Sequence, residues 1–251
     1  MGQFGIGDLA EAFRDSRWLF DSCVRRGDQL YAAWAVCSLA RCARGRIAFD
    51  ELLNCVSILP GNHLAATAAF MAEAHWHTFH KRSALALEAM EQAWAICVKN
   101  YYIVTTNTNV LCQLVTCLRL HAEALEKNGD AGAVAVRRRF DKMARWAKRL
   151  SWLLPPERPH ALRELSLRYA HRGKLATAHR LAASSCTAAE AMDARYEYAQ
   201  SLLVMGQIGK QLNLPEAESQ ISKAQSTIQE IEAAVDAELN APLNQSLSVQ
   251  D

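Results

Sequence analysis

The sequence of 251 residues contains few helix-breaking residues and no long apolar run. It has only six prolines and 11 glycines, which argues against an all-β protein. No uncharged apolar stretch reaches 18 residues, so we expect no transmembrane helix. Residues 1–18 lack the charged and apolar regions of a signal peptide, and Ile6 makes this a poor myristoylation site. We therefore expect a cytoplasmic protein without a membrane partner.

Motifs for catalysis and cofactor binding are also missing. The chain has no G-x-x-x-x-G-K-[ST] phosphate loop and neither the H-R-D nor the D-F-G motif of protein kinases. The segment GQFGIG at 2–7 lacks the strand, the lysine and the spacing of a phosphate loop. No spacing of Ser, His and Asp indicates a catalytic triad. We expect a protein that is not itself an enzyme and has no cofactor.

Eight cysteines are present, but no CxxC pair is found among them. Cys37/Cys42 and Cys112/Cys117 are five residues apart and would diverge by about 140° on a helix, so neither pair predicts a metal site. We interpret the cysteines as small buried hydrophobic residues in a reducing compartment.

About half of the residues are apolar, and they recur at helical spacing, most clearly between Arg158 and Leu203. Pro159 suits a first helical turn, and Gly173 suits a helix stop. Large apolar residues precede Gly173 and small ones follow it, with Gly206 33 residues further on. This order is typical of a tetratricopeptide-like helix pair.

The same periodicity extends along the chain. It predicts helices at 8–25, 28–43, 47–58, 63–80, 83–99, 108–127, 130–154, 158–172, 175–189, 193–205 and 215–239. Turns at Gly45, Arg82, Gly129, Gly173 and Gly206 would separate the helices, and the 47–58 helix would pair with the one before it. Residues 100–107, which include Tyr101 to Val104, are expected to form a loop or the entry to a helix. We predict an all-α fold, an α-α superhelix of stacked antiparallel helix pairs that spans 1–239 as one elongated right-handed array, followed by a polar tail at 240–251.

Three segments carry a resemblance to a known family. They are RPHALREL with the following Y..RGK, ARYEYAQSLL at 194–203, and the long segment 87–119. They resemble the C-terminal helical-repeat region of large multidomain signalling ATPases of the STAND type, which are linked to serine/threonine kinase, cyclase or histidine kinase modules. The resemblance covers about residues 30 to 235. It implies a fragment or relative of the non-catalytic part of such proteins.

One histidine cluster could be read as a metal site. It consists of His75, His77 and His80, with His63 upstream. On a helix His77 and His80 share a face, but His75 points about 160° away from His77, so the three would not converge as zinc ligands do. We therefore predict no metal site and expect half-buried polar rings.

Positive charge is concentrated between Arg137 and Arg180, which contain 13 Lys and Arg against three acidic residues. On the predicted helix there, Phe140, Met143, Ala144, Ala147 and Leu150 share one face. The opposite face carries Arg138, Lys142, Arg145 and Arg149. This pattern fits a solvated face, a contact for an acidic protein partner, or, less well, a nucleic-acid surface.

Two further features could contact partners. Arg195 and Tyr198 open a helix, where the tyrosine either packs between helices or forms a binding hot spot. The helix at 214–235 has apolar residues at strict spacings of three and four, which fits either a homodimeric coiled coil or a cap on the last repeat.

Three functions follow from these observations. The preferred one is a non-catalytic helical-repeat scaffold or regulatory region that mediates protein–protein interaction in signal transduction. The alternatives are a basic nucleic-acid-binding module at 137–180, and an all-α enzyme whose site has no readable motif.

Overall fold

The computed structural model describes residues 9–57, 63–100 and 107–241. The helices are α1 (Leu9–Arg26), α2 (Gln29–Ala43), α3 (Phe49–Ser57), α4 (His63–Phe79), α5 (Ser83–Lys99), α6 (Asn107–Lys127), α7 (Ala133–Leu150), η1 (Pro155–Glu157), α8 (Arg158–His171), α9 (Leu175–Glu190), α10 (Arg195–Gln211) and α11 (Ala217–Asn240). No strand occurs in this part of the chain, so the predicted all-α fold of packed helix pairs is confirmed.

Three sequence expectations fall wholly or mostly outside the described residues. They concern the GQFGIG segment at 2–7, the aromatic residues from Tyr101 to Val104, and the polar tail, of which only residues 240 and 241 are described. The predicted helix boundaries otherwise agree to within a few residues. The largest differences are at two helix ends: α10 continues to Gln211 rather than ending at residue 205, and α7 ends at Leu150 rather than at Leu154. Leu154 precedes Pro155 and adopts an extended ψ of 84°, because the proline ring disfavours helical backbone before it.

One turn geometry joins the two helices of every pair. In each turn a residue with positive φ is followed by a backbone N–H that bonds to the carbonyl five residues earlier. These bonds run from Asp28 to Cys23, Arg82 to His77, Asp130 to Leu125, Lys174 to Tyr169 and Leu214 to Gly209, at 2.9 to 3.0 Å. The positive-φ residues are Gly27, Lys81, Gly129, Gly173 and Asn213. This Schellman arrangement satisfies the last carbonyls of the first helix and reverses the chain.

Gly206 is not a turn, which corrects the sequence interpretation. It lies inside α10, where a Cβ atom would stand 2.8 Å from Ile221 Cγ1 and 3.0 Å from the Ala217 carbonyl oxygen. Gly206 therefore permits close packing of α10 on α11. Spacing alone could not separate this role from a helix stop, because glycine serves both.

The predicted partnership of the 47–58 helix with the 28–43 helix is also wrong. α2 packs mainly against α1 and α4, whereas α3 makes only slight contact with α2 and α4. α3 has nine residues, too few to cover the apolar side of α2. The pairs are α1–α2, α4–α5, α6–α7, α8–α9 and α10–α11, with α3 inserted between the first two.

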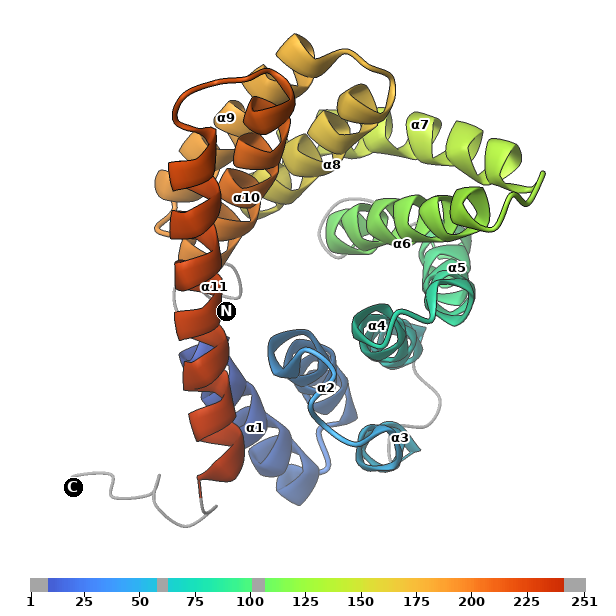
Figure 1. The fold of residues 1–251 in the computed structure, drawn as a ribbon. Helices are drawn as coiled ribbons and strands as arrows, with labels where there is room; N and C mark the ends of the chain where they lie inside the picture. Colours follow the sequence, from blue (N-terminus) through green and yellow to red (C-terminus); the bar gives the residue numbers. More distant parts are fainter. Residues whose placement is uncertain (1–8, 58–62, 101–106, 242–251) are drawn as a thin grey trace.

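The array closes on itself instead of extending. Figure 1 shows the pairs arranged around a centre, with red α11 returning to blue α1, and these two helices are in contact. The apolar seam of α11 buries Ala217, Ala224, Ile231 and Val235. α11 packs against α10 and α1 of the same chain, which favours the cap interpretation over a dimeric coiled coil.

The core is made largely of small residues, because closely stacked helices leave little room for large ones. Seven of the eight cysteines are buried and all eight are free thiols, as expected of small hydrophobic residues. Burial raises the pKa of the Cys37 and Cys117 thiols to about 12, which keeps them protonated. No helix in the described part of the chain is both long enough and apolar enough to cross a bilayer.

Candidate functional site

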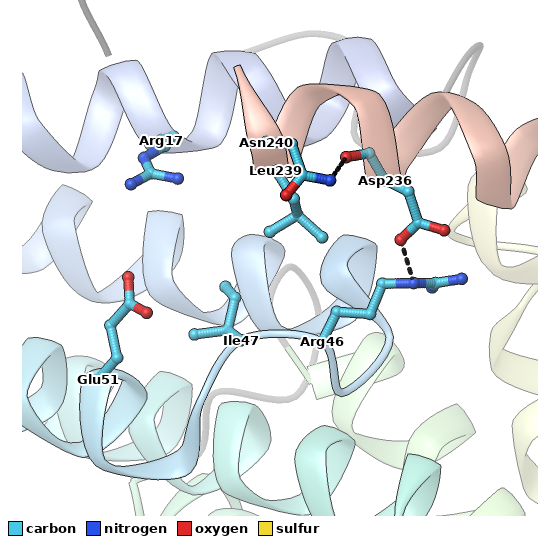
Figure 2. A pocket seen from close by; sticks show the side chains of 7 residues that line it. All are labelled: Arg17, Arg46, Ile47, Glu51, Asp236, Leu239 and Asn240. Atoms are coloured by element: carbon cyan, nitrogen blue, oxygen red, sulfur yellow. Dashed lines mark hydrogen bonds and ion pairs between the residues drawn. The ribbon is translucent and has the colours of Figure 1, made fainter. Parts of the chain in front are cut away.

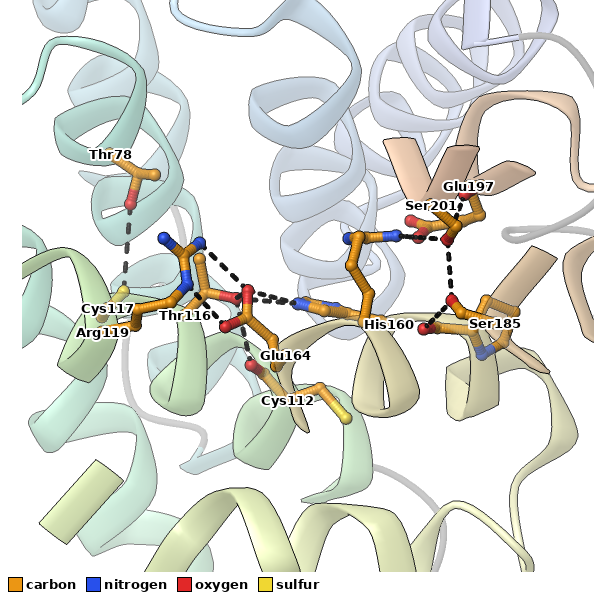
Figure 3. A network of polar contacts seen from close by, with 12 residues as sticks. Thr78, Cys112, Thr116, Cys117, Arg119, His160, Glu164, Ser185, Glu197 and Ser201 are labelled. Atoms are coloured by element: carbon orange, nitrogen blue, oxygen red, sulfur yellow. Dashed lines mark hydrogen bonds and ion pairs between the residues drawn. The ribbon is translucent and has the colours of Figure 1, made fainter. Parts of the chain in front are cut away.

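The helices form an inner and an outer layer. Figure 1 shows the even-numbered helices α2, α4, α6, α8 and α10 toward the centre and the odd-numbered ones at the periphery. The inner helices carry a network of polar and charged side chains (Figure 3). Because each inner helix supplies at least one member, this inner polar network extends from α2 to α10.

One half of the network joins α6 to α8. Arg119 binds Glu164 through two bonds, Nε to Oε2 at 2.7 Å and Nη2 to Oε1 at 3.1 Å. Thr116 donates its hydroxyl to Glu164 Oε1 at 2.9 Å. Burial by itself would raise the pKa of Glu164, but Arg119 outweighs it and holds that pKa at about 2. Glu164 is therefore a buried carboxylate held in its charged form.

The other half joins α8 to α10 and reaches α2. Glu197 accepts from Arg163 Nη1 at 2.5 Å and from Arg41 Nη2 at 3.1 Å. Two guanidinium groups thus share one carboxylate. Burial would raise the pKa of Glu197, but the arginines, Arg163 foremost, lower it to about 2. Ser185 and Ser201 hydrogen-bond at 2.7 Å and tie α9 to this group.

Two buried histidines lie in the network with a ring nitrogen that has no hydrogen-bond partner. They are His75 and His160, each 5% exposed, and the unpartnered atoms are His75 Nε2 and His160 Nδ1. Burial and the nearby arginines, Arg41 for His75 and Arg163 for His160, lower the pKa of His75 to about 3 and that of His160 to about 4. Both rings are therefore neutral at physiological pH.

The hydrogen bonds define which nitrogen of His160 carries the proton. His160 Nε2 lies 2.8 Å from the Thr116 hydroxyl, whose single hydrogen is donated to Glu164. Nε2 must then be the donor, which leaves Nδ1 as an acceptor that lacks a donor. A buried acceptor of this kind is unusual, because almost all buried polar groups are paired.

The predicted basic face lies elsewhere, on the outer helix α7. Arg138, Lys142, Arg145 and Arg149 are exposed, while Phe140, Met143, Ala144 and Ala147 are buried, as the spacing predicted. Much of the surrounding positive charge is already paired within the chain. The pairs are Arg137 with Glu126, Arg139 with Glu91, and Arg168 and Arg172 with Asp141. The role of the face in binding stays a prediction.

Arg195 and Tyr198 do not join the α7 face, because α10 lies in another part of the ring. Arg195 pairs with Glu230 of α11 at 2.5 Å, and both side chains are more than half exposed. Tyr198 is half-buried, with Lys223 Nζ 5.8 Å from its ring centre. This environment favours packing between α10 and α11.

The histidine cluster is divided between two surroundings. His75 belongs to the inner polar network, whereas His80 stacks on Trp76 with ring centres 3.9 Å apart. His77 lies against Phe49 and 3.6 Å from the Glu73 carboxylate. Among the described residues, no group of three or more His, Cys, Asp or Glu side chains is placed to hold a metal ion.

Four site residues were not predicted from the sequence, namely Arg41, Thr116, Arg119 and Arg163. A signal was present in α6, where Thr116 lies within the mostly buried stretch from Val110 to Leu118 and Arg119 directly follows it. A polar residue at a buried helix position predicts a polar partner on a neighbouring helix. The partner itself is defined only by the packing of α6 against α8.

No protein-family model and no curated protein matches the sequence. Among solved structures, the chain is similar to BtubC (BKLC) from P. vanneervenii, known from a crystal structure, with 12% identity and a TM-score of 0.55. The match covers 94% of each chain. At this identity the similarity supports the helical fold alone, and the association with signalling ATPases stays a prediction.

Proposed function

We propose that this chain is a non-catalytic helical-repeat scaffold that binds a segment of another protein at the inner polar network, in the cytoplasm and as a regulatory part of a signalling system. The observation that carries the proposal is the placement of Arg41, Arg119 and Arg163 with buried carboxylates and two unpartnered histidine nitrogens. All of them come from the inner helices.

Stability alone is a poor explanation for such a network. Taking charges out of water costs several kcal/mol per ion, and well-packed apolar residues often replace a buried ion pair without loss of stability. The two histidine nitrogens add a further cost, because each is buried without a partner. A role in binding at the exposed edge of the network, where Arg41 and Glu123 reach the surface, would account for keeping these charges.

The network reaches the protein surface at its edge, where an incoming segment would meet it. The side chains of Arg41 and Glu123 are 26% and 46% exposed, and Glu123 binds Arg119 from the next helical turn. The nucleic-acid alternative has weaker support, because much of the basic stretch forms ion pairs within the chain.

A displayed random-peptide library selected on the purified chain tests the proposal. Selected peptides should bind Arg41→Gln and Glu123→Gln at least about tenfold more weakly than wild type, because each variant loses a charge-assisted bond to the peptide. Arg138→Gln, on the outer face of α7, is the matched control and should bind normally. Circular dichroism must show that each variant is folded.

The proposal is contradicted if no peptide is enriched, or if only Arg138→Gln weakens binding. Hydrolysis of ATP or GTP by the purified chain would contradict its non-catalytic part. A gel shift with nucleic acid that weakens steeply with salt would favour the alternative module instead.

A further inference from the structure

A pocket lies where the two ends of the array meet. It has a volume of 420 Å³ and lies between α1, the loop after α2, α3 and α11 (Figure 2). This volume falls within the usual range for small-molecule sites. The pocket is separate from the inner polar network and shares no residue with it.

One end of the pocket is closed by an ion pair between the two ends of the array. Arg46 Nε binds Asp236 Oδ1 of α11 at 2.5 Å, and its Nη2 lies 3.6 Å from Glu232. Ile47 and Leu239 form an apolar wall beside this pair (Figure 2). Because Arg46 and Asp236 neutralise each other, we do not expect a charged ligand to pair with either of them.

The other end of the pocket presents two opposite charges that do not meet. Arg17 comes from α1 and Glu51 from α3, and Figure 2 shows them across the pocket from each other. Within the described residues, neither has an ion pair at 4.0 Å or less, with the other or with any third residue. The space between the guanidinium and the carboxylate is thus bounded by one unpaired charge of each sign.

We propose that this pocket binds a small zwitterion with an apolar part, namely a free amino acid. The ligand carboxylate pairs with Arg17, the ligand ammonium group pairs with Glu51, and the ligand side chain lies on Ile47 and Leu239. Arginine suits the carboxylate because its planar N–H groups match the two carboxylate oxygens.

Binding at this position has a consequence for the ring. The pocket is lined by α1 and α3 from one end of the array and by α11 from the other, so only the closed ring forms the complete site. A ligand that binds only the closed form stabilises it by RT ln(1 + [L]/Kd), so the stabilisation grows with the logarithm of the ligand concentration above Kd. The closed form of the ring would therefore become more stable as the concentration of the amino acid rises.

The experiment uses the full chain and measures melting temperature with each of the 20 standard amino acids. Each amino acid that raises it is then compared, by calorimetry, with its N-acetyl derivative and its amide, which lack the ammonium and the carboxylate respectively. Wild type should bind each derivative at least about tenfold more weakly than the parent, because each lacks one charge-assisted contact.

Two variants separate the contacts. The Arg17→Gln protein should bind the amino acid and its amide with equal affinity. The Glu51→Gln protein should bind the amino acid and its N-acetyl derivative with equal affinity. Arg25→Gln, an exposed change on the same helix α1, should retain both preferences. No response to any amino acid, or equal preferences in wild type and both pocket variants, would overturn the proposal. Neither result bears on peptide binding at the inner network.

Discussion

Arg41 and Glu197 are 156 residues apart in the chain, and their side chains meet at 3.1 Å. Arg41 lies on α2, in the first helix pair, and Glu197 lies on α10, in the last. The bond therefore joins opposite ends of the array across its inner side. Together with the pairing of Arg46 and Asp236, it makes the first and last repeats neighbours.

Removing Glu197 should destabilise the whole ring. Glu197→Ala leaves Arg41 and Arg163 buried without a carboxylate, and losing one partner of a buried pair costs about 3–5 kcal/mol. Urea unfolding should show this loss. Glu230→Ala removes the exposed partner of Arg195 and should change stability by no more than about 0.5 kcal/mol. Equal effects of the two variants would show that Arg41 and Glu197 do not hold the ring.

Stability should fall as the pH drops from 7 to 5. The folded pKa values of His75 and His160 are about 3 and about 4, below the ordinary value of 6.5, so the unfolded chain binds more protons in this window. Each of these two histidines then lowers the free energy of unfolding by about 2 kcal/mol at pH 5. Glu164 and Glu197 have folded pKa values of about 2, so they lower the free energy of unfolding only below about pH 4.5.

A variant isolates the histidine effect, because Glu157, whose pKa is raised by burial, opposes it at acidic pH. His75→Gln should lose less stability between pH 7 and pH 5 than wild type, by about 2 kcal/mol. His63→Gln changes an exposed histidine and should retain the wild-type slope. Identical pH profiles for all three proteins would mean that His75 titrates normally in the folded state.

Gly206→Ala should destabilise the chain although alanine favours helices. The new Cβ would stand 2.8 Å from Ile221 Cγ1 and 3.0 Å from the Ala217 carbonyl oxygen, and overpacking costs about 1–3 kcal/mol. Adding Ile221→Ala should recover part of this loss, because it removes one of the crowded atoms. A more stable Gly206→Ala protein, as helix propensity alone would give, would refute the close packing.

Gly173→Val tests whether this position needs glycine for its backbone conformation rather than for close packing. A Cβ there would meet no atom within 4 Å, but φ is +69°, which a β-branched residue adopts only under strain. We expect a loss of about 1–2 kcal/mol from the backbone alone. Gly173→Asn should lose less, since asparagine tolerates left-handed backbone. Unchanged melting of the valine variant would contradict the Schellman turn.

Ile231→Asp distinguishes a cap from a dimer interface. Ile231 is 2% exposed on a helix that packs on α10 and α1, so the new carboxylate would be buried within its own chain. We expect a markedly lower melting temperature, because an unpaired buried charge costs several kcal/mol. The exposed change Gln229→Asp on the same helix is the control. Sedimentation that shows a wild-type dimer converted to a stable monomer would restore the coiled-coil interpretation.

The sequence was a good guide to local structure. Apolar spacing located each helix to within a few residues, and glycine located three of the five turns within pairs. The other two use Lys81 and Asn213 in the same left-handed conformation, which residue type alone does not reveal. The outward orientation of Arg138 and Lys142 was also readable, because one helix turn determines which residues share a face.

The residues alone predict an all-α chain of helix pairs, since periodicity and turn chemistry act over a few residues. Three features depend on the packing of distant helices: the closure of the array, the position of Gly206 at a helix crossing, and the contact between Arg41 and Glu197. Each of these depends on the small rotation between successive helix pairs, summed over the whole array. No local pattern encodes that sum, so the inner polar network and the pocket between the two ends emerged only from the complete fold.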